Sequence, residues 1–203
     1  MRSLKTFPLL ILAFFVAFWA DSPITSTDFA QAYSDVAMVK QADKIRTLDL
    51  EIAAYLDDPE VAVDCKAAVI NALSWDIDGK HNAELFKYYL ALRHQKTLSQ
   101  LQTEDLTGDE LFCLGYLTVM DDYFNPDPAL PYLEEARRKN PKSFTVAIIT
   151  ALVQAQKLMD TDWGAVWKVT ERVLEDKSLK SDMRSKAKQV IVDYMVLYRD
   201  DGE

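Results

Sequence analysis

Glycine, cysteine and histidine are scarce in this chain of 203 residues, which contains five Gly, two Cys and two His. The prolines lie near the ends of predicted helices or in the N-terminal leader, and strand-type alternation of apolar and polar residues is hard to find between turn signals. This composition predicts an all-α fold.

Sequence motifs for common catalytic and metal sites are also missing. The chain has no His-Glu-x-x-His, Cys-x-x-Cys, Gly-x-Ser-x-Gly or phosphate-loop pattern. His81 and His94 do not share a metal-binding spacing. We therefore expect no catalytic residue, no metal and no cofactor.

Long apolar runs are confined to the N-terminus. Arg2 and Lys5 precede an apolar run over residues 7–20, broken by Pro8, and Asp21 follows it. This is the three-part layout of a secretory signal, and the run is shorter than the roughly 20 residues that a spanning helix needs. The sequence predicts a signal peptide over residues 1–20 and a periplasmic or secreted protein without a membrane span. An uncleaved N-terminal membrane anchor is the alternative.

Positive charge is in the minority. The whole chain has 32 acidic and 23 basic residues, a net charge of -9. Loss of residues 1–20 would remove Arg2 and Lys5 and leave 32 acids against 21 bases, or -11. Such a charge repels phosphate backbones, so we expect no nucleic-acid partner, and it favours a basic protein or peptide through attraction that weakens with salt.

Residues 21–203 contain enough apolar sequence for one core and no low-complexity linker, which predicts a single domain. Apolar spacings of three and four residues predict seven or eight helices arranged in antiparallel hairpins. Their approximate ranges are 28–55 (as one helix or two), 59–75, 82–98, a helix that opens at Thr107 and Gly108 and holds Phe112 and Tyr116, 132–139, 144–159, 163–174 and a last helix that holds Val190, Tyr194 and Leu197.

One pair of predicted helices carries a recognisable pattern. On the first helix lie Leu111, Leu114 and Gly115, and on the second lie Ala129, Leu133, Ala136 and Pro141. In residues 111–141 the chain thus resembles a degenerate tetratricopeptide repeat, in which small residues let two helices approach and a large one fills the groove between them. The resemblance implies a right-handed superhelix of stacked hairpins with a surface that binds a peptide or a partner helix.

Cys65 and Cys113 lie on the first helices of what would be successive hairpins. In an oxidising compartment a disulfide between them would contribute roughly 4 kcal/mol by closing a long loop. Two separately buried thiols are the alternative.

Two further sets of residues are candidate binding groups. Ser74, Asp76, Asp78 and Glu84 approximate a calcium loop between two helices, but the acidic residue comes one position early, and an ordinary turn at Gly79 is the favoured interpretation. Trp163 and Trp167 are one turn apart among charged residues, so either could be an exposed anchor for a partner.

These observations favour an exported, noncatalytic protein-binding or scaffolding module. A small acidic immunity-type protein that neutralises a basic toxin is one alternative. An enzyme whose site is assembled from dispersed Asp, Glu and Tyr residues is another.

Overall fold

The fold was analysed in a computed structural model that describes residues 22–199. This part of the chain forms nine α-helices and no strand, which confirms the all-α prediction. The helices are α1 (Ala37–Ile45), α2 (Leu50–Asp57), α3 (Val63–Leu73), α4 (Asn82–Arg93), α5 (Gly108–Asp121), α6 (Leu130–Lys139), α7 (Phe144–Leu158), α8 (Val166–Glu175) and α9 (Ser185–Met195). The count exceeds eight because the stripe predicted over 28–55 divides into α1 and α2 after a short 3-10 helix, η1 (Ala30–Tyr33). The predicted signal peptide, residues 1–20, lies outside the described residues.

Side-chain caps fix the start of several helices. Thr107 and Glu110 form a reciprocal capping box at the start of α5, in which each side chain accepts a hydrogen bond from the other residue's backbone N–H. At the start of α7 the Ser143 side chain accepts a hydrogen bond from the backbone N–H of Val146. These caps satisfy backbone donors that the first turn of a helix leaves unpaired, so the starts of α5 and α7 agree with the sequence prediction.

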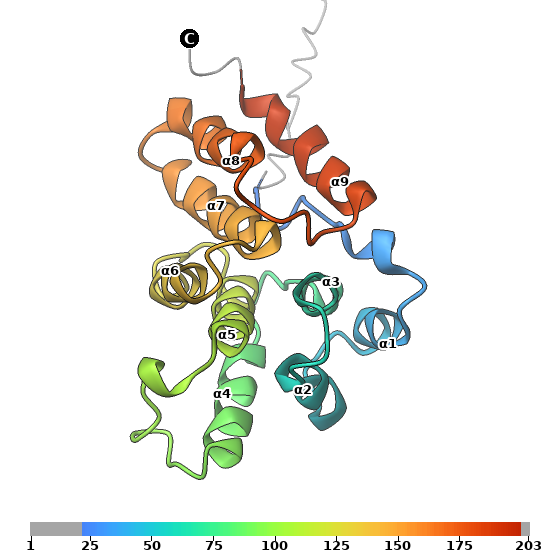
Figure 1. Cartoon of the computed structure of the whole chain (residues 1–203), viewed down its shortest axis with the longest axis vertical. Coiled ribbons are helices and arrows are strands. Elements are labelled where there is room, and N and C mark those ends of the chain that lie inside the picture. The colour runs from blue at the N-terminus through green and yellow to red at the C-terminus, as the bar shows by residue number, and fades with distance from the viewer. Residues whose placement is uncertain (1–21, 200–203) are drawn as a thin grey trace, which may run out of the picture.

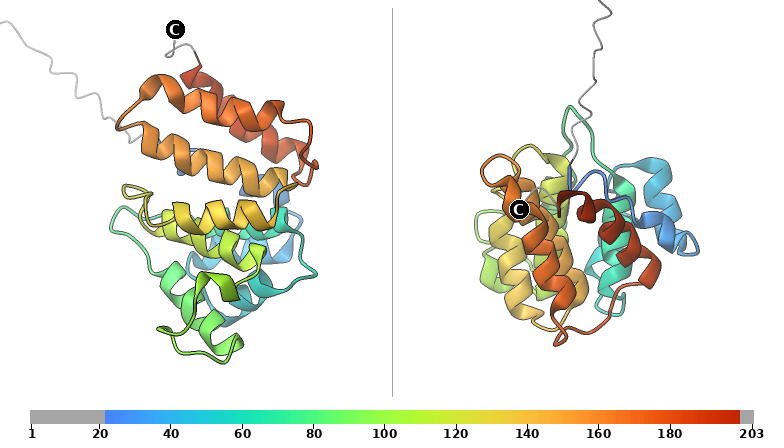
Figure 2. Two further views of the ribbon diagram at one scale, coloured as in Figure 1. Left: turned by 60° about the vertical axis from the view of Figure 1, so that its left-hand side comes forward. Right: turned by 90° about the horizontal axis from the view of Figure 1, so that it is seen from above.

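Helices α4 to α8 form a stack along one side of the molecule (Figures 1 and 2). Each of these five helices contacts the next in sequence, and α3, α5 and α7 also contact one another across the stack. Helices α1 and α2 lie beside α3 and below α9 in Figure 1. None of the helices in residues 22–199 is long and apolar enough to cross a bilayer.

The residues that resemble a tetratricopeptide repeat lie in the hairpin of α5 and α6. Gly115 faces the side chains of Leu133 and Tyr132, and Ala129, Leu133 and Ala136 are buried. Ala129 precedes the first turn of α6, and Pro131 follows within that turn, where it costs no hydrogen bond. The two helices thus pack closely, while a repetition of this unit as a superhelix stays a prediction.

Residues 22–34 cross the inner side of the stack before the first α-helix begins. Ser22, Ile24, Thr27 and Phe29 in this N-terminal segment are almost completely buried. Its 3-10 helix η1 contacts α3 and α9, so segments from the two ends of the described chain lie side by side. Seen from above in Figure 2, the segment runs through the middle of the molecule.

Candidate functional site

The N-terminal segment is held in place much as a bound peptide would be. The Asn71 side chain of α3 accepts a hydrogen bond from the backbone N–H of Ala30 (2.9 Å) and donates one to the backbone carbonyl of Thr27 (3.1 Å). It donates a second hydrogen bond to the hydroxyl of Tyr116 on α5, also at 3.1 Å. A buried amide that satisfies both a donor and an acceptor of a neighbouring backbone fixes the register of that segment.

Further contacts anchor the two ends of the segment. At the first end, the Ser22 hydroxyl donates to the side chain of Gln156 on α7 and accepts from the backbone N–H of Ile24 (3.3 Å). At the other end, the Tyr33 hydroxyl donates to the Asp64 carboxylate of α3 (2.8 Å) and accepts from the backbone N–H of Arg184 (3.1 Å). The segment therefore spans the distance from α7 to α3.

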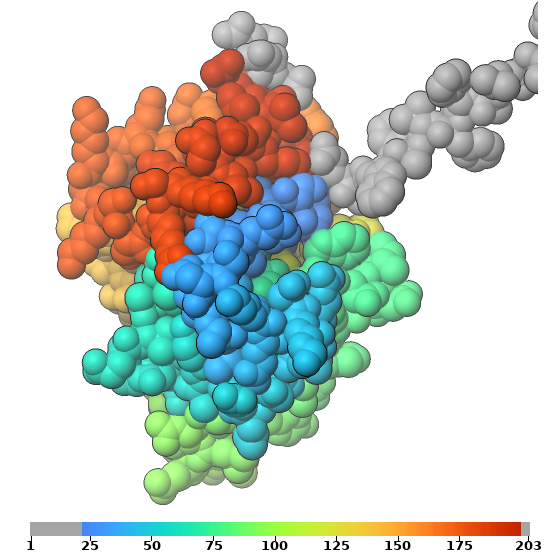
Figure 3. Space-filling view, turned by 90° about the vertical axis from the view of Figure 1, so that its right-hand side faces the viewer, coloured from blue at the N-terminus to red at the C-terminus, as the bar shows by residue number. Residues whose placement is uncertain are grey.

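A pocket of about 610 Å³ adjoins this segment. We call it the N-terminal pocket, and Figure 3 views the molecule from the side on which the N-terminal segment and α1 reach the surface. Its walls come from the N-terminal segment, from α1, from the end of α3 and from single residues of α5 and α9. Residues that line it include Asp28, Gln31, Lys40, Asp43, Arg46, Asn71, Trp75 and Lys186.

The N-terminal pocket has the size of a small-ligand or peptide site and a mixed charge. Asp28 and Asp43 supply carboxylates, whereas Lys40, Arg46 and Lys186 supply cations. Its floor includes the amide of Asn71, whose partner Tyr116 has a pKa raised by burial and so stays protonated. Such a surface can bind polar groups and backbone amides of an extended chain.

The structure does not assemble a calcium site from Ser74, Asp76, Asp78 and Glu84. The Asp76 carboxylate accepts from the backbone N–H of Asp78 (3.1 Å), and Gly79 has a φ of 80°, as in the ordinary turn that the sequence favoured. Nearby, the Lys80 ammonium donates to the backbone carbonyls of Arg46 (2.7 Å) and Leu73 (2.6 Å). Among the described residues no cluster of three His, Cys, Asp or Glu side chains could hold a metal ion.

Cys65 and Cys113 are free thiols in the structure, without the disulfide that the sequence suggested. Cys113 is fully buried in α5, and its thiol approaches the backbone carbonyl of Leu56 at 3.8 Å. Cys65 on α3 is partly exposed, and burial together with the nearby Asp64 carboxylate raises the pKa of its thiol. The observed arrangement corresponds to two separate thiols.

Trp163 and Trp167 do not share one regular helix, because residues 163–165 form a 3-10 turn and α8 begins at Val166. Trp163 is 44% exposed and makes an edge-to-face contact with Tyr198 at a centroid distance of 5.5 Å. The indole N–H of Trp167 donates to the Glu171 carboxylate at 2.9 Å. Trp163 thus remains the better candidate for a partner anchor, at a site remote in sequence from the N-terminal pocket.

Sequence reasoning missed the N-terminal pocket because its walls come from five separate segments. The one local signal was Asn71, a polar residue within the apolar run over residues 67–73. A buried amide in such a run needs hydrogen-bond partners from elsewhere in the chain, and this need marks it as an anchor. Comparison with protein-family models, with curated proteins and with solved structures found no match.

Proposed function

We propose that this protein is an exported, noncatalytic binding module that holds an extended segment of a partner protein in the N-terminal pocket. The observation that carries the proposal is the way in which the fold binds residues 22–34. Asn71 pairs with both the N–H and the carbonyl groups of this segment, and the pocket continues beside it. A segment of a partner could lie along residues 22–34 and use the remaining polar groups of the pocket.

The tetratricopeptide-like resemblance supports the same proposal. Stacked helical hairpins commonly bind peptides on the inner side of the stack, and residues 22–34 of this chain lie on that side. The net charge of -9 favours a basic partner. Lys40 and Lys186 in the pocket would engage carboxylates of that partner or its C-terminus, whereas Arg46 is paired with Asp43 at 3.4 Å.

A crosslinking experiment in the native organism tests the proposal. A photoreactive amino acid is placed at Gln31 or at Lys40, both exposed residues that line the pocket. The matched control carries the same group at Lys168, an exposed residue of α8. After illumination, the full chain is purified from the envelope and secreted fractions, and its adducts are identified by mass spectrometry.

We expect one predominant protein adduct from Gln31 and Lys40 and none from Lys168. The yield should fall as salt rises if the partner is basic. Equal adducts from all three positions, or none from the pocket positions in an exported protein, would contradict the proposal. N-terminal sequencing of the same material would show whether residues 1–20 are removed.

A further inference from the structure

Helix α4 is apolar on two opposite sides, although it lies at one end of the stack. Phe86, Leu90 and Ala91 are buried on its inner side, against the rest of the fold. On its outer side Leu85, Tyr88 and Leu92 are 46%, 48% and 79% exposed. Their spacing of three and four residues places them in one stripe. Helices within a stack need two apolar sides because a neighbour covers each side, whereas an end helix needs only one.

Helix α2 extends this apolar stripe sideways. The Asn82 side chain at the start of α4 accepts a hydrogen bond from the backbone N–H of Leu48, just before α2 (2.8 Å). At the other end of both helices the Asp57 carboxylate accepts from Arg93 (2.8 Å) and from the Tyr89 hydroxyl (3.3 Å). The two helices therefore run side by side in the same direction.

Leu50 lies seven residues before Asp57 and so shares its side of α2, the side that faces α4. Leu50 is 71% exposed. Leu50 and the stripe of Leu85, Tyr88 and Leu92 are thus exposed apolar residues on two adjoining helices, and we call these four residues the α2–α4 face. Single exposed apolar residues are common in soluble proteins, but a row of four on two adjoining helices indicates a contact surface.

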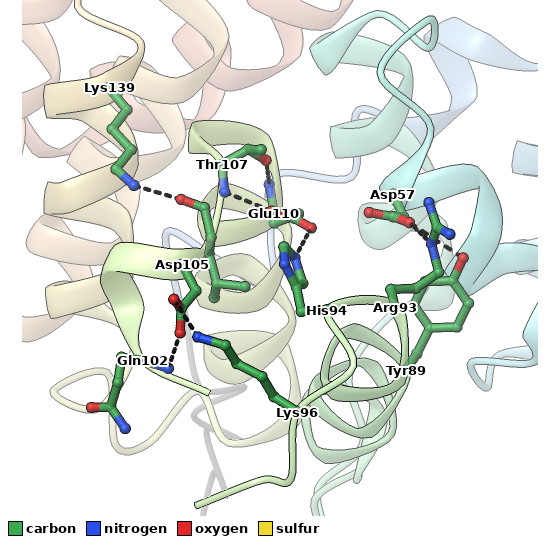
Figure 4. A network of polar contacts seen from close by, with 11 residues as sticks. Asp57, Tyr89, Arg93, His94, Lys96, Gln102, Asp105, Thr107, Glu110 and Lys139 are labelled. Atoms are coloured by element: carbon green, nitrogen blue, oxygen red, sulfur yellow. Dashed lines mark hydrogen bonds and ion pairs between the residues drawn. The ribbon is translucent and has the colours of Figure 1, made fainter. Parts of the chain in front are cut away.

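A network of polar contacts joins the end of α4 to α2 and α5 (Figure 4). His94, at the end of α4, and the buried Glu110 of α5 are joined by a contact of 2.7 Å between Nε2 and Oε1. Glu110 also accepts from the backbone N–H of Thr107 at 2.6 Å. Below them, Lys96 pairs with Asp105 at 2.5 Å. Because α4 is tied at both ends to α2 and α5, the α2–α4 face is already formed before any partner arrives.

The charges beside the α2–α4 face are mostly negative. Residues 49–60 contain five acids and no base, namely Asp49, Glu51, Asp57, Asp58 and Glu60. On α4 the Glu84 side chain is 62% exposed. The Arg93 guanidinium pairs with Asp57, so these two charges offset each other and the other four acids of residues 49–60 set the sign. Lys87 contributes one positive charge on the same helix. A partner with positive charge beside its apolar stripe would complement this arrangement.

We propose that the α2–α4 face docks an amphipathic helix of a partner protein, with leucine-like residues along its contact side and Lys or Arg beside them. The stripe of Leu85, Tyr88 and Leu92 matches the spacing at which two helices interlock. A second copy of this chain fits less well, because it would bring the same acidic edge against itself. The face is separate from the N-terminal pocket, so failure of either proposal leaves the other standing.

A displayed library of helical peptides tests this proposal with the full chain as bait. Each peptide has Leu at the contact positions, and its flanking positions are randomised among Lys, Glu and Gln. Two variants carry the test, Leu92→Asp on the α2–α4 face and Glu51→Lys/Glu84→Lys at its edge. Leu197→Asp is the matched control, because Leu197 is similarly exposed at 64% but lies after α9.

We expect Lys to be enriched at the flanking positions of the recovered peptides. Leu92→Asp should weaken binding about tenfold or more, Leu197→Asp should leave it unchanged, and the double charge reversal should shift the preference from Lys to Glu. Three outcomes would overturn the proposal: no enriched peptide, peptides that bind the Leu92→Asp variant equally well, or sedimentation showing a dimer that Leu92→Asp dissociates. Circular dichroism confirms that each variant is folded.

Discussion

Gly115 of α5 lies so close to Leu133 of α6 that a Cβ atom added to Gly115 would be 2.7 Å from Leu133 Cγ. Such a separation is shorter than real carbon contacts, so the absence of a side chain at Gly115 is what allows the two helices to approach. Tyr132 Cβ would be 3.1 Å from the same added atom, so a new methyl group at Gly115 would be crowded by both Leu133 and Tyr132. The contact explains a glycine in the middle of a helix, where this residue is otherwise unfavourable.

Gly115→Ala should therefore destabilise the protein, although the same change stabilises an ordinary exposed helix. Overpacking costs about 1–3 kcal/mol, and the better helix propensity of Ala returns about 1 kcal/mol. We expect a net loss of up to about 2 kcal/mol in the free energy of unfolding, measured by urea denaturation. A gain in stability would contradict the close contact. In combination with Leu133→Ala the two losses should be less than additive, because the new methyl group then enters the vacated space.

Asn71→Ala should loosen the N-terminal segment. It removes a buried amide that serves the backbone of Thr27 and Ala30 and the hydroxyl of Tyr116, and each stranded buried group costs about 1–3 kcal/mol. We expect faster hydrogen exchange at the amide of Ala30 together with lower global stability. Tyr116→Phe is the control, since it removes one of these contacts and leaves the clamp on the backbone. Unchanged exchange at Ala30 in Asn71→Ala would show that the clamp does not hold the segment.

The dependence of stability on pH should carry a contribution from Asp121. Its carboxylate accepts from the backbone N–H of Ala83 at 2.7 Å, while its other oxygen has no hydrogen-bond partner within the described residues. Burial raises the pKa of Asp121 above its ordinary value. An acid with a raised pKa in the folded state contributes stability at low pH, and this contribution is lost as the pH rises through the folded-state pKa.

The stability of Asp121→Asn relative to the wild type should therefore increase as the pH is raised from below about 4 to neutrality. Urea denaturation at a series of pH values measures this difference. Asp122→Asn changes an exposed neighbour and should show little effect at any pH. A relative stability that falls with rising pH would mean that Asp121 is stabilised as an anion.

The two cysteines should differ in reactivity. Burial raises the pKa of the Cys113 thiol strongly, and Cys113 is enclosed by the core. Cys65 is partly exposed. We expect iodoacetamide to modify Cys65 in the native protein and Cys113 only after unfolding, with mass spectrometry of peptides as the measurement. A mass lower by two hydrogens in material from the native compartment would instead reveal the disulfide.

Calcium should not affect thermal stability. The Lys80 ammonium bonds to the carbonyls of Arg46 and Leu73 beside the turn that resembles a calcium loop. The ammonium group of Lys80 thus supplies the positive charge that a bound calcium ion would otherwise supply beside this turn. Melting curves recorded with millimolar calcium and with a chelator should therefore coincide. Lys80→Ala should lower the melting temperature, since it leaves the partly buried carbonyl of Leu73 without this donor. A rise in melting temperature with calcium would contradict this assignment.

Local patterns in the sequence predicted the helices of the stack well and the N-terminal region poorly. The capping residues Thr107 and Glu110 at the start of α5 are only three positions apart, so local sequence is enough to predict where this helix begins. Phe29 and Tyr33 have the spacing of an α-helix, but Phe29 only precedes a 3-10 helix, η1, and Tyr33 ends it. Hydrogen bonds to Asn71, more than 40 residues away, override the local preference, and no local pattern contains that information.

The candidate sites were hidden for two different physical reasons. The N-terminal pocket is built from segments that only the folded chain brings together, which a single sequence does not indicate. The stripe on α4 is visible in the sequence, but Leu85 and Leu92 look like core residues because periodicity does not distinguish a buried side from an exposed one. In both cases the missing information was which neighbour lies opposite each residue.

The contact between Tyr33 and Arg184 also determines when folding can be completed. The Tyr33 ring lies under the guanidinium of Arg184 at 4.4 Å, and the two residues are 151 positions apart. Arg184 and α9 cannot pack against the N-terminal segment until nearly the whole chain has been synthesised. Enclosure of the N-terminal segment by α9 should therefore be a late step of folding, because it closes one of the longest loops in the chain.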